Sequence, residues 1–175
     1  MKVNTTRFGE ISVPEEDIIT FPLGILGFNK RSRYVILNDP STEPLRWLQS
    51  VEDDSLAFVI IDPLRFRSEY TVDLSDEDVS SLELNGPEEA IIYSIVVIPK
   101  DTPEKMTANL QGPIVINAAK MTAKQVISTD PKHKLKHFVL EEMKDMLAQS
   151  QKKLGKLSLN LNRKSKGHTQ IDGEA

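Results

Sequence analysis

Short apolar runs separated by turn-forming residues fill the first 128 positions of the chain. The clearest runs are 34–37, 56–61 and 91–98, and each is followed within a few residues by a proline. Shorter runs lie at 8–13, 18–21, 45–51, 114–117 and 125–127. Repeated short runs bounded by Pro, Gly, Asn and Asp are typical of an all-β sandwich or barrel. The pattern therefore predicts a mainly β fold whose most continuous runs are central strands buried on both faces.

One segment within this β-rich part, residues 73–82, predicts a short helix. Ser75 is followed three positions later by Asp78, the spacing at which a serine caps the N-terminus of a helix. Asp76, Glu77 and Asp78 would then lie in the first turn, where the helix dipole favours negative charge.

A second helix is predicted from about 134 to 154. Apolar residues recur there at positions i, i+3, i+4 and i+7, which indicates an amphipathic helix, and Gly155 is a typical stop signal. The residues from Lys156 onward are polar with isolated leucines, and we expect them to be loosely ordered. The fold class predicted is thus a compact, antiparallel β-barrel-like domain with one or two short helices and a helical, then flexible, C-terminal extension.

The net charge of −4 is divided unevenly along the chain. Residues 1–131 hold 12 Lys and Arg against 21 Asp and Glu, a balance of −9, whereas residues 132–168 hold 10 against 3, a balance of +7. An acidic body repels phosphate and favours a basic protein partner. The alternative interpretation is that the acids only keep a small domain soluble.

The composition also restricts the compartment. No cysteine is present, so disulfides and thiolate metal sites are excluded and a cytoplasmic location is expected. No stretch approaches the roughly 20 apolar residues that a membrane helix needs. The first residues contain no apolar segment of a signal peptide. We therefore expect no membrane partner.

Residues that could carry catalysis or bind a metal are few. His133 and His137 are four positions apart, the spacing of two ligands on one helix face, but no third ligand accompanies them. We expect two solvated histidines among lysines. Nucleotide-binding and nucleophile motifs are absent from the sequence, so we expect no enzyme, no cofactor and no small-molecule substrate. A small hydrolase or isomerase with a dispersed site is the alternative, with Asp, Glu and His as its only plausible catalysts.

Three segments are more distinctive than their composition. Residues 21–28 read Phe-Pro-Leu-Gly-Ile-Leu-Gly-Phe, where the two glycines permit positive φ and the second phenylalanine is expected to return to the core. Residues 47–50 read Trp-Leu-Gln-Ser and are followed by the apolar run that ends at Asp62-Pro63. Residues 107–117 contain the turn Gly112-Pro113 before a buried strand. Together and in this order, the three segments resemble the flagellar assembly factor FliW family.

The resemblance implies a function in flagellum assembly. Members of that family are β-barrel-like proteins that bind newly made flagellin in the bacterial cytoplasm and also bind CsrA, an RNA-binding repressor of flagellin translation. Flagellin that accumulates would occupy the protein and leave CsrA free to silence the message. Export of flagellin would free the protein to bind CsrA and relieve the block. The implied partners are therefore flagellin and CsrA, without direct contact to nucleic acid.

The contact surface predicted for a partner follows the central apolar run. Phe66 and Tyr70 alternate there with charged residues, which is the composition of aromatic anchors inside a charged rim. The alternative is that both rings face the core from an edge strand. Polar residues within apolar segments, namely Gln49, Ser50 and Asn109, are expected to bind backbone groups in buried turns rather than a partner. The complete predicted contact set is Pro63, Phe66, Tyr70, Asp73, Asp76, Glu77 and Asp78.

The C-terminal part departs from the family. The resemblance covers about residues 1–137, so we place the β-rich domain there and treat 138–175 as an extension made of an amphipathic helix and a basic polar tail. Within the extension, 159–165 and 170–173 resemble the opening hairpin of CsrA, although a solvated basic tail is the alternative interpretation. A tail folded back on the acidic body could tune access to a partner. A further alternative is an RNA-binding protein that uses this tail.

Overall fold

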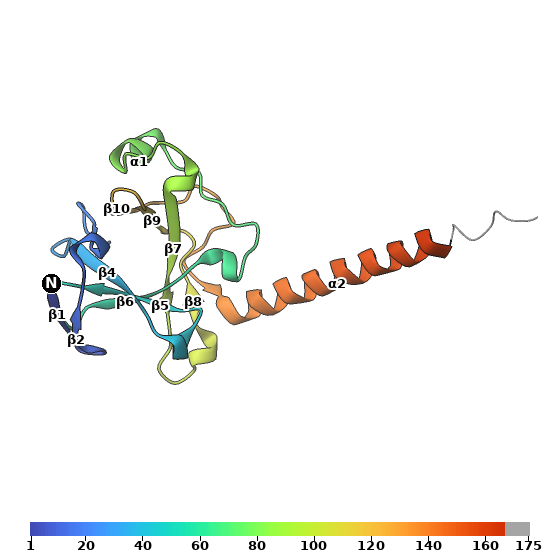
Figure 1. Cartoon of the computed structure of the whole chain (residues 1–175), viewed down its shortest axis with the longest axis horizontal. Helices are drawn as coiled ribbons and strands as arrows, with labels where there is room; N and C mark the ends of the chain where they lie inside the picture. The colour runs from blue at the N-terminus through green and yellow to red at the C-terminus, as the bar shows by residue number, and fades with distance from the viewer. Residues whose placement is uncertain (167–175) are drawn as a thin grey trace, which may run out of the picture.

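Seven strands form a closed ring in the computed structural model, which describes residues 1–166 (Figure 1). In order round the ring they are β7 (Ala90–Val97), β6 (Ala57–Ile61), β5 (Arg46–Ser50), β4 (Arg33–Asn38), β3 (Ile19–Thr20), β10 (Thr122–Gln125) and β9 (Ile114–Asn117). The ring closes because β9 also pairs with β7. All pairings within the ring are antiparallel except the single register pair between β10 and β3, which is parallel. The predicted mainly β, barrel-like fold is confirmed.

Strand β7 closes the ring because it is long enough to pair with different strands along its length. Its first half, Ala90 to Tyr93, is in register with β9, and its second half, from Ser94, is in register with β6. Tyr93 pairs with Ile114, and the next residue, Ser94, pairs with Ile61. The long apolar run in the sequence therefore marks the strand around which the barrel closes.

The barrel interior is filled by aromatic and branched side chains. Phe21 and Tyr34 are fully buried and meet edge to face, with ring centroids 5.2 Å apart. Leu48, Ile60 and Ile114 pack in the same cluster. Every residue of β9 is buried, so the expectation of burial on both faces holds for that strand. It fails for the run at 91–98, because β7 exposes 43% of Ile91 and 64% of Val97.

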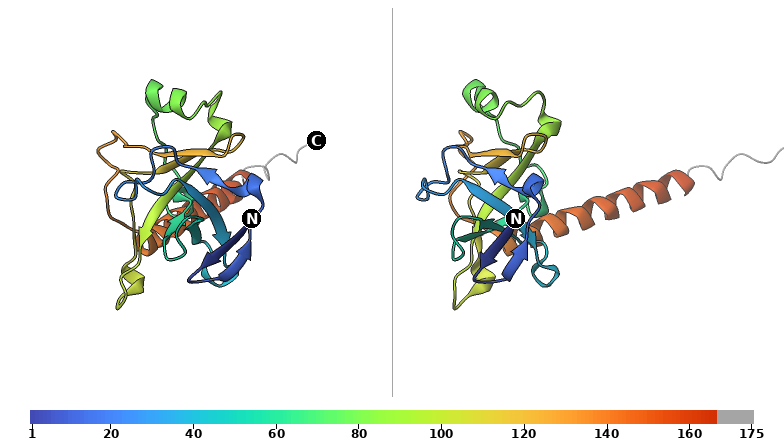
Figure 2. Two further views of the ribbon diagram at one scale, coloured as in Figure 1. Left: turned by 90° about the vertical axis from the view of Figure 1, so that its left-hand side faces the viewer. Right: turned by 60° about the vertical axis from the view of Figure 1, so that its left-hand side comes forward.

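Further strands and short helices lie outside the ring. Strand β8 (Thr107–Ala108) pairs with β7 and with β11 (His137–Phe138), while β1 (Lys2–Thr5) and β2 (Gly9–Ser12) form a separate hairpin. The apolar pattern did not predict β1, β8 or β11, because each is short and contains only one apolar residue. Figure 2 shows this hairpin at the side of the barrel where the N-terminus lies. Short 3-10 helices lie at Glu15–Asp17, Pro40–Thr42, Pro63–Arg65, Pro87–Glu89 and Pro103–Lys105.

Helix α1 (Asp76–Ser81) begins where the sequence predicts it. The Oγ of Ser75 accepts a hydrogen bond from the backbone N–H of Asp78 at 3.1 Å, so the predicted N-cap is confirmed. The three acids occupy the first turn as expected.

Helix α2 (Val139–Lys166) differs from its prediction at both ends. It begins five residues later than residue 134, and it continues through Gly155 instead of stopping there. Glycine costs a helix only about 1 kcal/mol, and the lysines and leucines on either side are good helix formers. The expectation of loose order from Lys156 is therefore wrong as far as Lys166.

The same helix overturns two expectations about the extension. Residues 159–165 are helical, so they do not form the first strand of a CsrA-like hairpin, and the matching stretch at 170–173 lies outside the described residues. Figure 1 shows α2 leaving the barrel as a straight rod, so the extension does not fold back on the acidic body through Lys166. The division into domains after residue 137 stays a prediction.

Candidate protein-binding surface

The aromatic residues of the predicted contact set are inside the molecule. Phe66 is 1% exposed and Tyr70 is 6% exposed, and both pack with Ile61 and Val139 in a second apolar cluster. The Tyr70 hydroxyl donates to the carbonyl oxygen of Leu110 at 3.3 Å, and burial raises the pKa of Tyr70. Pro63 is buried as well. The interpretation of Phe66 and Tyr70 as exposed anchors is therefore wrong. Both rings face the core, as the alternative predicts, but neither residue lies on an edge strand.

Asp78 has a structural partner. Its carboxylate lies 2.7 Å from the Nζ of Lys124 on β10, and the two side chains are only 17% and 20% exposed. Burial alone would raise the pKa of Asp78, but the hydrogen bonds from Lys124 and Ser75 outweigh it and lower the pKa. Asp78 thus joins α1 to the barrel, while Asp73, Asp76 and Glu77 remain exposed on the surface.

A buried asparagine fixes the chain after α1. The Nδ2 of Asn117 donates to the carbonyl oxygens of Leu82 at 2.9 Å and Glu83 at 3.2 Å. Its Oδ1 accepts from the backbone N–H groups of Ala119 and Lys120. Leu82 is buried against Val115 of β9, so α1 is attached to the barrel by polar and apolar contacts together. The end of a strand thereby holds a surface helix in one position.

A groove lies between the segment that carries α1 and strand β7. Its volume is about 430 Å³, and Asp73 and Asn85 line it beside apolar side chains. We call it the α1 groove, and its apolar lining is Val72, Leu74, Val79, Leu84, Pro87, Ala90 and Ile92. Val79 is 36% exposed there. An apolar floor with carboxylates beside it suits a protein segment that has apolar anchors and positive charge.

A second surface is formed by the glycine loop, residues 21–28. Gly24 and Gly27 have φ values of +67° and +85°, as the sequence predicts. A Cβ at Gly24 would lie 2.7 Å from the Cα of Asn29, so only glycine fits there. Leu23 and Leu26 are 70% and 67% exposed. Phe28 is 42% exposed and packs edge to face on Phe58, so the expectation that it returns to the core is wrong.

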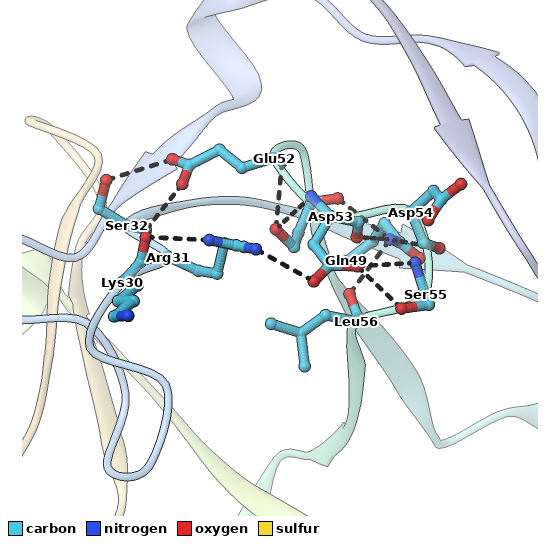
Figure 3. A network of polar contacts seen from close by, with 10 residues as sticks. Lys30, Arg31, Ser32, Gln49, Glu52, Asp53, Asp54, Ser55 and Leu56 are labelled. Carbon is cyan, nitrogen blue, oxygen red and sulfur yellow. Dashed lines mark hydrogen bonds and ion pairs between the residues drawn. The ribbon is translucent and has the colours of Figure 1, made fainter.

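The turn beside this loop is stabilised by a polar network (Figure 3). The amide nitrogen of Gln49, which points into the turn, donates to carbonyl oxygens including those of Ser50 at 3.0 Å and Leu56 at 3.1 Å. Ser50 Oγ accepts from the backbone N–H groups of Glu52 and Asp53, and Arg31 pairs with Asp53 at 3.5 Å. The predicted role of Gln49 and Ser50 in a buried turn is confirmed.

The three distinctive sequence segments meet at this end of the barrel. Leu26 of the glycine loop donates its N–H to Gln125 Oε1 at 3.0 Å, and Gln125 Nε2 donates to the carbonyl oxygen of Gly112 at 3.0 Å. Asn109 Oδ1 accepts from the N–H groups of Gln111 and Gly112, which confirms its predicted turn role. The glycine loop is thus held by side chains from distant parts of the chain.

The two histidines that lie four positions apart in the sequence are buried, although we expected solvated side chains. His133 and His137 are 7% and 8% exposed and precede α2 rather than lying on it. His137 Nε2 accepts from the backbone N–H of Lys134 at 2.9 Å, so in the neutral ring Nδ1 carries the proton and donates to Glu142 at 3.1 Å. Glu142 also pairs with Arg67. These contacts attach the first turn of α2 to the barrel.

Ser128, Asp130 and His133 form one tight turn. Ser128 Oγ lies 2.6 Å from His133 Nδ1 and accepts from the backbone N–H of Asp130 at 3.3 Å. His133 stacks on Tyr70, with ring centroids 4.7 Å apart, and burial lowers its pKa although the Asp130 carboxylate opposes the shift. Ser128 and His133 are therefore buried together, while Asp130 stays exposed, and the contacts of the turn order the chain before β11.

Within residues 1–166, no cluster of three or more His, Cys, Asp or Glu side chains could hold a metal ion. Over the same residues, none of the helices is both long and apolar enough to cross a membrane. The α1 groove, the glycine loop and the rod formed by α2 are prominent features of the surface formed by these residues. All three present exposed apolar side chains.

Comparison with known proteins decides the family. A sequence profile described as FliW protein matches residues 2–139, most of the chain. The chain belongs to the FliW family. Flagellar assembly factors FliW from Leptospira biflexa and Ruminiclostridium cellulolyticum are 39% and 41% identical over 144 residues, which is 82% of this chain and 94% and 97% of those proteins. The FliW of Geobacter sulfurreducens is 43% identical over 137 residues.

A solved structure supports the same conclusion. The crystal structure of a flagellar assembly factor FliW superimposes with a TM-score of 0.72 at 37% identity, covering 79% of this chain and 96% of that one. The FliW profile ends at residue 139, which is the first residue of α2. The projecting part of α2 therefore lies beyond the part of the chain that the profile matches.

Proposed function

We propose that this FliW family member is a cytoplasmic, protein-binding regulator of flagellum assembly. It binds flagellin, and when flagellin has been exported it binds CsrA and relieves the repression of flagellin translation. In this proposal the protein catalyses no reaction and needs no cofactor. Membership of a family of flagellar assembly factors supports the assignment to flagellum assembly.

The observation that carries the proposal is the α1 groove with its exposed acids. Asp73 lines the groove, and Asp76 and Glu77 are exposed in the first turn of α1 beside it. We assign this surface to CsrA, because an apolar groove flanked by carboxylates on a body with a balance of −9 attracts a basic partner. The assignment keeps Asp73, Asp76 and Glu77 from the predicted contact set. Phe66 and Tyr70 belong to the cluster against which the groove residues Val72 and Ile92 pack, and Asp78 joins α1 to Lys124. Pro63 is buried and is left out of the contact.

A charge-reversal experiment tests the surface. The double variant Asp76→Lys with Glu77→Lys should weaken CsrA binding by about tenfold or more, since it replaces attraction by repulsion at the groove. The matched control is Glu16→Lys with Asp17→Lys, which reverses two adjacent exposed acids in another short helix. Isothermal titration with purified CsrA measures both affinities, and thermal unfolding checks that both variants fold. Equal losses in the two variants would remove the α1 groove from the contact.

Competition tests the circuit as a whole. Immobilised chain should retain purified flagellin and purified CsrA separately, and added flagellin should displace CsrA, because occupation by one partner excludes the other in the proposed cycle. Failure to retain either partner at micromolar concentration would refute the proposed function. If both partners were retained at the same time, the proposal that they exclude each other would be refuted, whereas the proposal that the chain binds each of them would stand.

A further inference from the structure

The outer part of α2 carries a row of exposed leucines. Leu147, Leu154 and Leu161 are spaced by seven residues, Leu157 lies between the last two, and all four are between 59% and 67% exposed. At 100° per residue, these positions fall within one narrow sector of the helix. We call this row the leucine stripe. A heptad spacing of this kind is what a second helix needs in order to pack along the first.

The charges on the same stretch all have one sign. Between 147 and 164 there is no Asp or Glu, and the five charged residues are Lys152, Lys153, Lys156, Arg163 and Lys164. The helical repeat places Lys153 and Lys164 beside the leucine stripe and the other three on the opposite side. Any helix that packs along the stripe therefore meets positive charge at its border.

The charge pattern discriminates between possible occupants. A second copy of α2 over the same stretch would place Lys153 and Lys164 of each helix at the border of the shared seam, with no acid between 147 and 164 to pair with them. An anionic membrane is favoured by a broad apolar face with aromatic residues. The stretch from 147 to 164 contains no aromatic residue, and its leucine stripe is narrow. An acidic amphipathic helix satisfies both the apolar and the charged positions.

We propose that α2 from Leu147 onward docks an acidic amphipathic helix of a partner protein. The leucine stripe packs against the apolar seam of that helix, and Lys153 and Lys164 pair with acids that flank the seam. The docking stretch is about 27 Å long at 1.5 Å per residue, which is enough for roughly two and a half heptads. This site is separate from the α1 groove and does not depend on the function proposed for it.

A peptide experiment on the full chain tests the proposal. The probe is a fluorescein-labelled peptide of about three heptads with Leu at the a and d positions and Glu at the e and g positions. Its counterpart has Lys at e and g. Fluorescence anisotropy should show saturable binding of the Glu peptide, about tenfold or more tighter than binding of the Lys peptide. Equal affinity for the two peptides would overturn the charge argument and with it the proposal.

The helix offers a matched pair of variants. Leu154 and Leu159 are 66% and 63% exposed on the same helix, but Leu159 lies on the side away from the leucine stripe. Leu154→Gln should weaken the Glu peptide by about fivefold or more, whereas Leu159→Gln should change its affinity by less than about twofold. Gln is a good helix former, so circular dichroism at 222 nm should be equal in both variants. Equal effects of the two substitutions would overturn the proposal.

Other occupants give distinct results. Sedimentation of the chain alone should show a monomer over the concentrations used, and a dimer that Leu154→Gln abolishes would assign the leucine stripe to a second copy instead. Vesicles of phosphatidylglycerol and phosphatidylcholine, and poly(U) RNA, should bind the parent chain and Leu154→Gln equally weakly. Binding to either that is tighter than to the Glu peptide would overturn the proposal.

Discussion

Leu48 and Leu154 are the same amino acid, yet the barrel buries the first completely whereas α2 exposes 66% of the second. Leu48 packs with Phe21 and Tyr34, side chains that reach it from other strands. Leu154 lies on a rod whose backbone hydrogen bonds are all local. The comparison shows that the barrel is stabilised by contacts between distant segments, whereas α2 beyond its first two turns depends on helix propensity alone.

The junction between the two regions is short. Val139 is 1% exposed in the barrel's second cluster, and Met143 packs against the same cluster. Glu142 pairs with Arg67, and His137 binds Glu142. From Leu147 onward the described side chains are exposed. Within residues 1–166 the rod is therefore attached to the barrel at its N-terminal end only, and changes in it are expected to leave the barrel unaffected.

The largest expected effect is in the barrel. Phe21→Ala removes a fully buried ring and leaves a cavity, which should lower the free energy of unfolding by about 3–5 kcal/mol. Leu154→Ala should change it by less than about 0.5 kcal/mol, because the leucine packs on nothing that unfolds with the barrel. Urea denaturation followed by tryptophan fluorescence measures both. A loss above about 2 kcal/mol for Leu154→Ala would mean that α2 and the barrel unfold as one cooperative unit.

A smaller effect is expected at the junction when the pH is lowered. Burial lowers the pKa of His133 below its ordinary value of 6.5, so the unfolded chain takes up a proton more readily than the folded one. Stability is then fully present above pH 6.5 and is lost as the pH falls through the folded-state pKa. Between pH 7.5 and 5, Tm should fall further in the parent chain than in His133→Gln. Parallel Tm curves for the two proteins would contradict the role of His133.

The smallest effect on the barrel is expected from Gly155→Ala. Nothing lies within 4 Å of a Cβ at this position, and alanine favours the helix by about 1 kcal/mol over glycine. The ellipticity at 222 nm should become more negative, and amide exchange around residue 155 should slow. The Tm of the barrel should be unchanged within error. A rise in barrel Tm would show that helix order in α2 is transmitted to the barrel.

Features with local causes could be predicted from the sequence. The Ser75 cap, the positive φ of Gly24 and the turn contacts of Gln49 all follow from residues a few positions apart. Most barrel strands were predicted from apolar runs, since buried strands are rich in apolar residues. The exception is β10 (Thr122–Gln125), which is mostly polar and ends at the first residue of the predicted run at 125–127. The family resemblance required three such segments in the correct order.

Features with distant causes could not be predicted in this way. Tyr70 is buried where its hydroxyl donates a hydrogen bond to the carbonyl oxygen of Leu110, 40 residues away, and His137 is buried beside Arg67, 70 residues away. Charged neighbours in the sequence indicated exposure for both, so the predictions were wrong. The α1 groove depends on Asn117, which binds Leu82 across 35 residues. The prediction that the helix stops at Gly155 was wrong for the opposite reason. There a local stop signal was outweighed by good helix formers on both sides.

Closure of the ring limits the ways in which another protein could be recognised. Because β7 pairs with β9 as well as with β6, every ring strand has a neighbour on both sides. Within residues 1–166, the strands with a free edge along their whole length are β11 and those of the β1–β2 hairpin, and ring strands are open only in part, as in residues 35–38 of β4. A partner that adds a strand to the sheet binds mainly through backbone hydrogen bonds, and few free edges are available here for such binding. Selectivity must then come from side chains on loops and helices, the positions where sequence can change without opening the barrel.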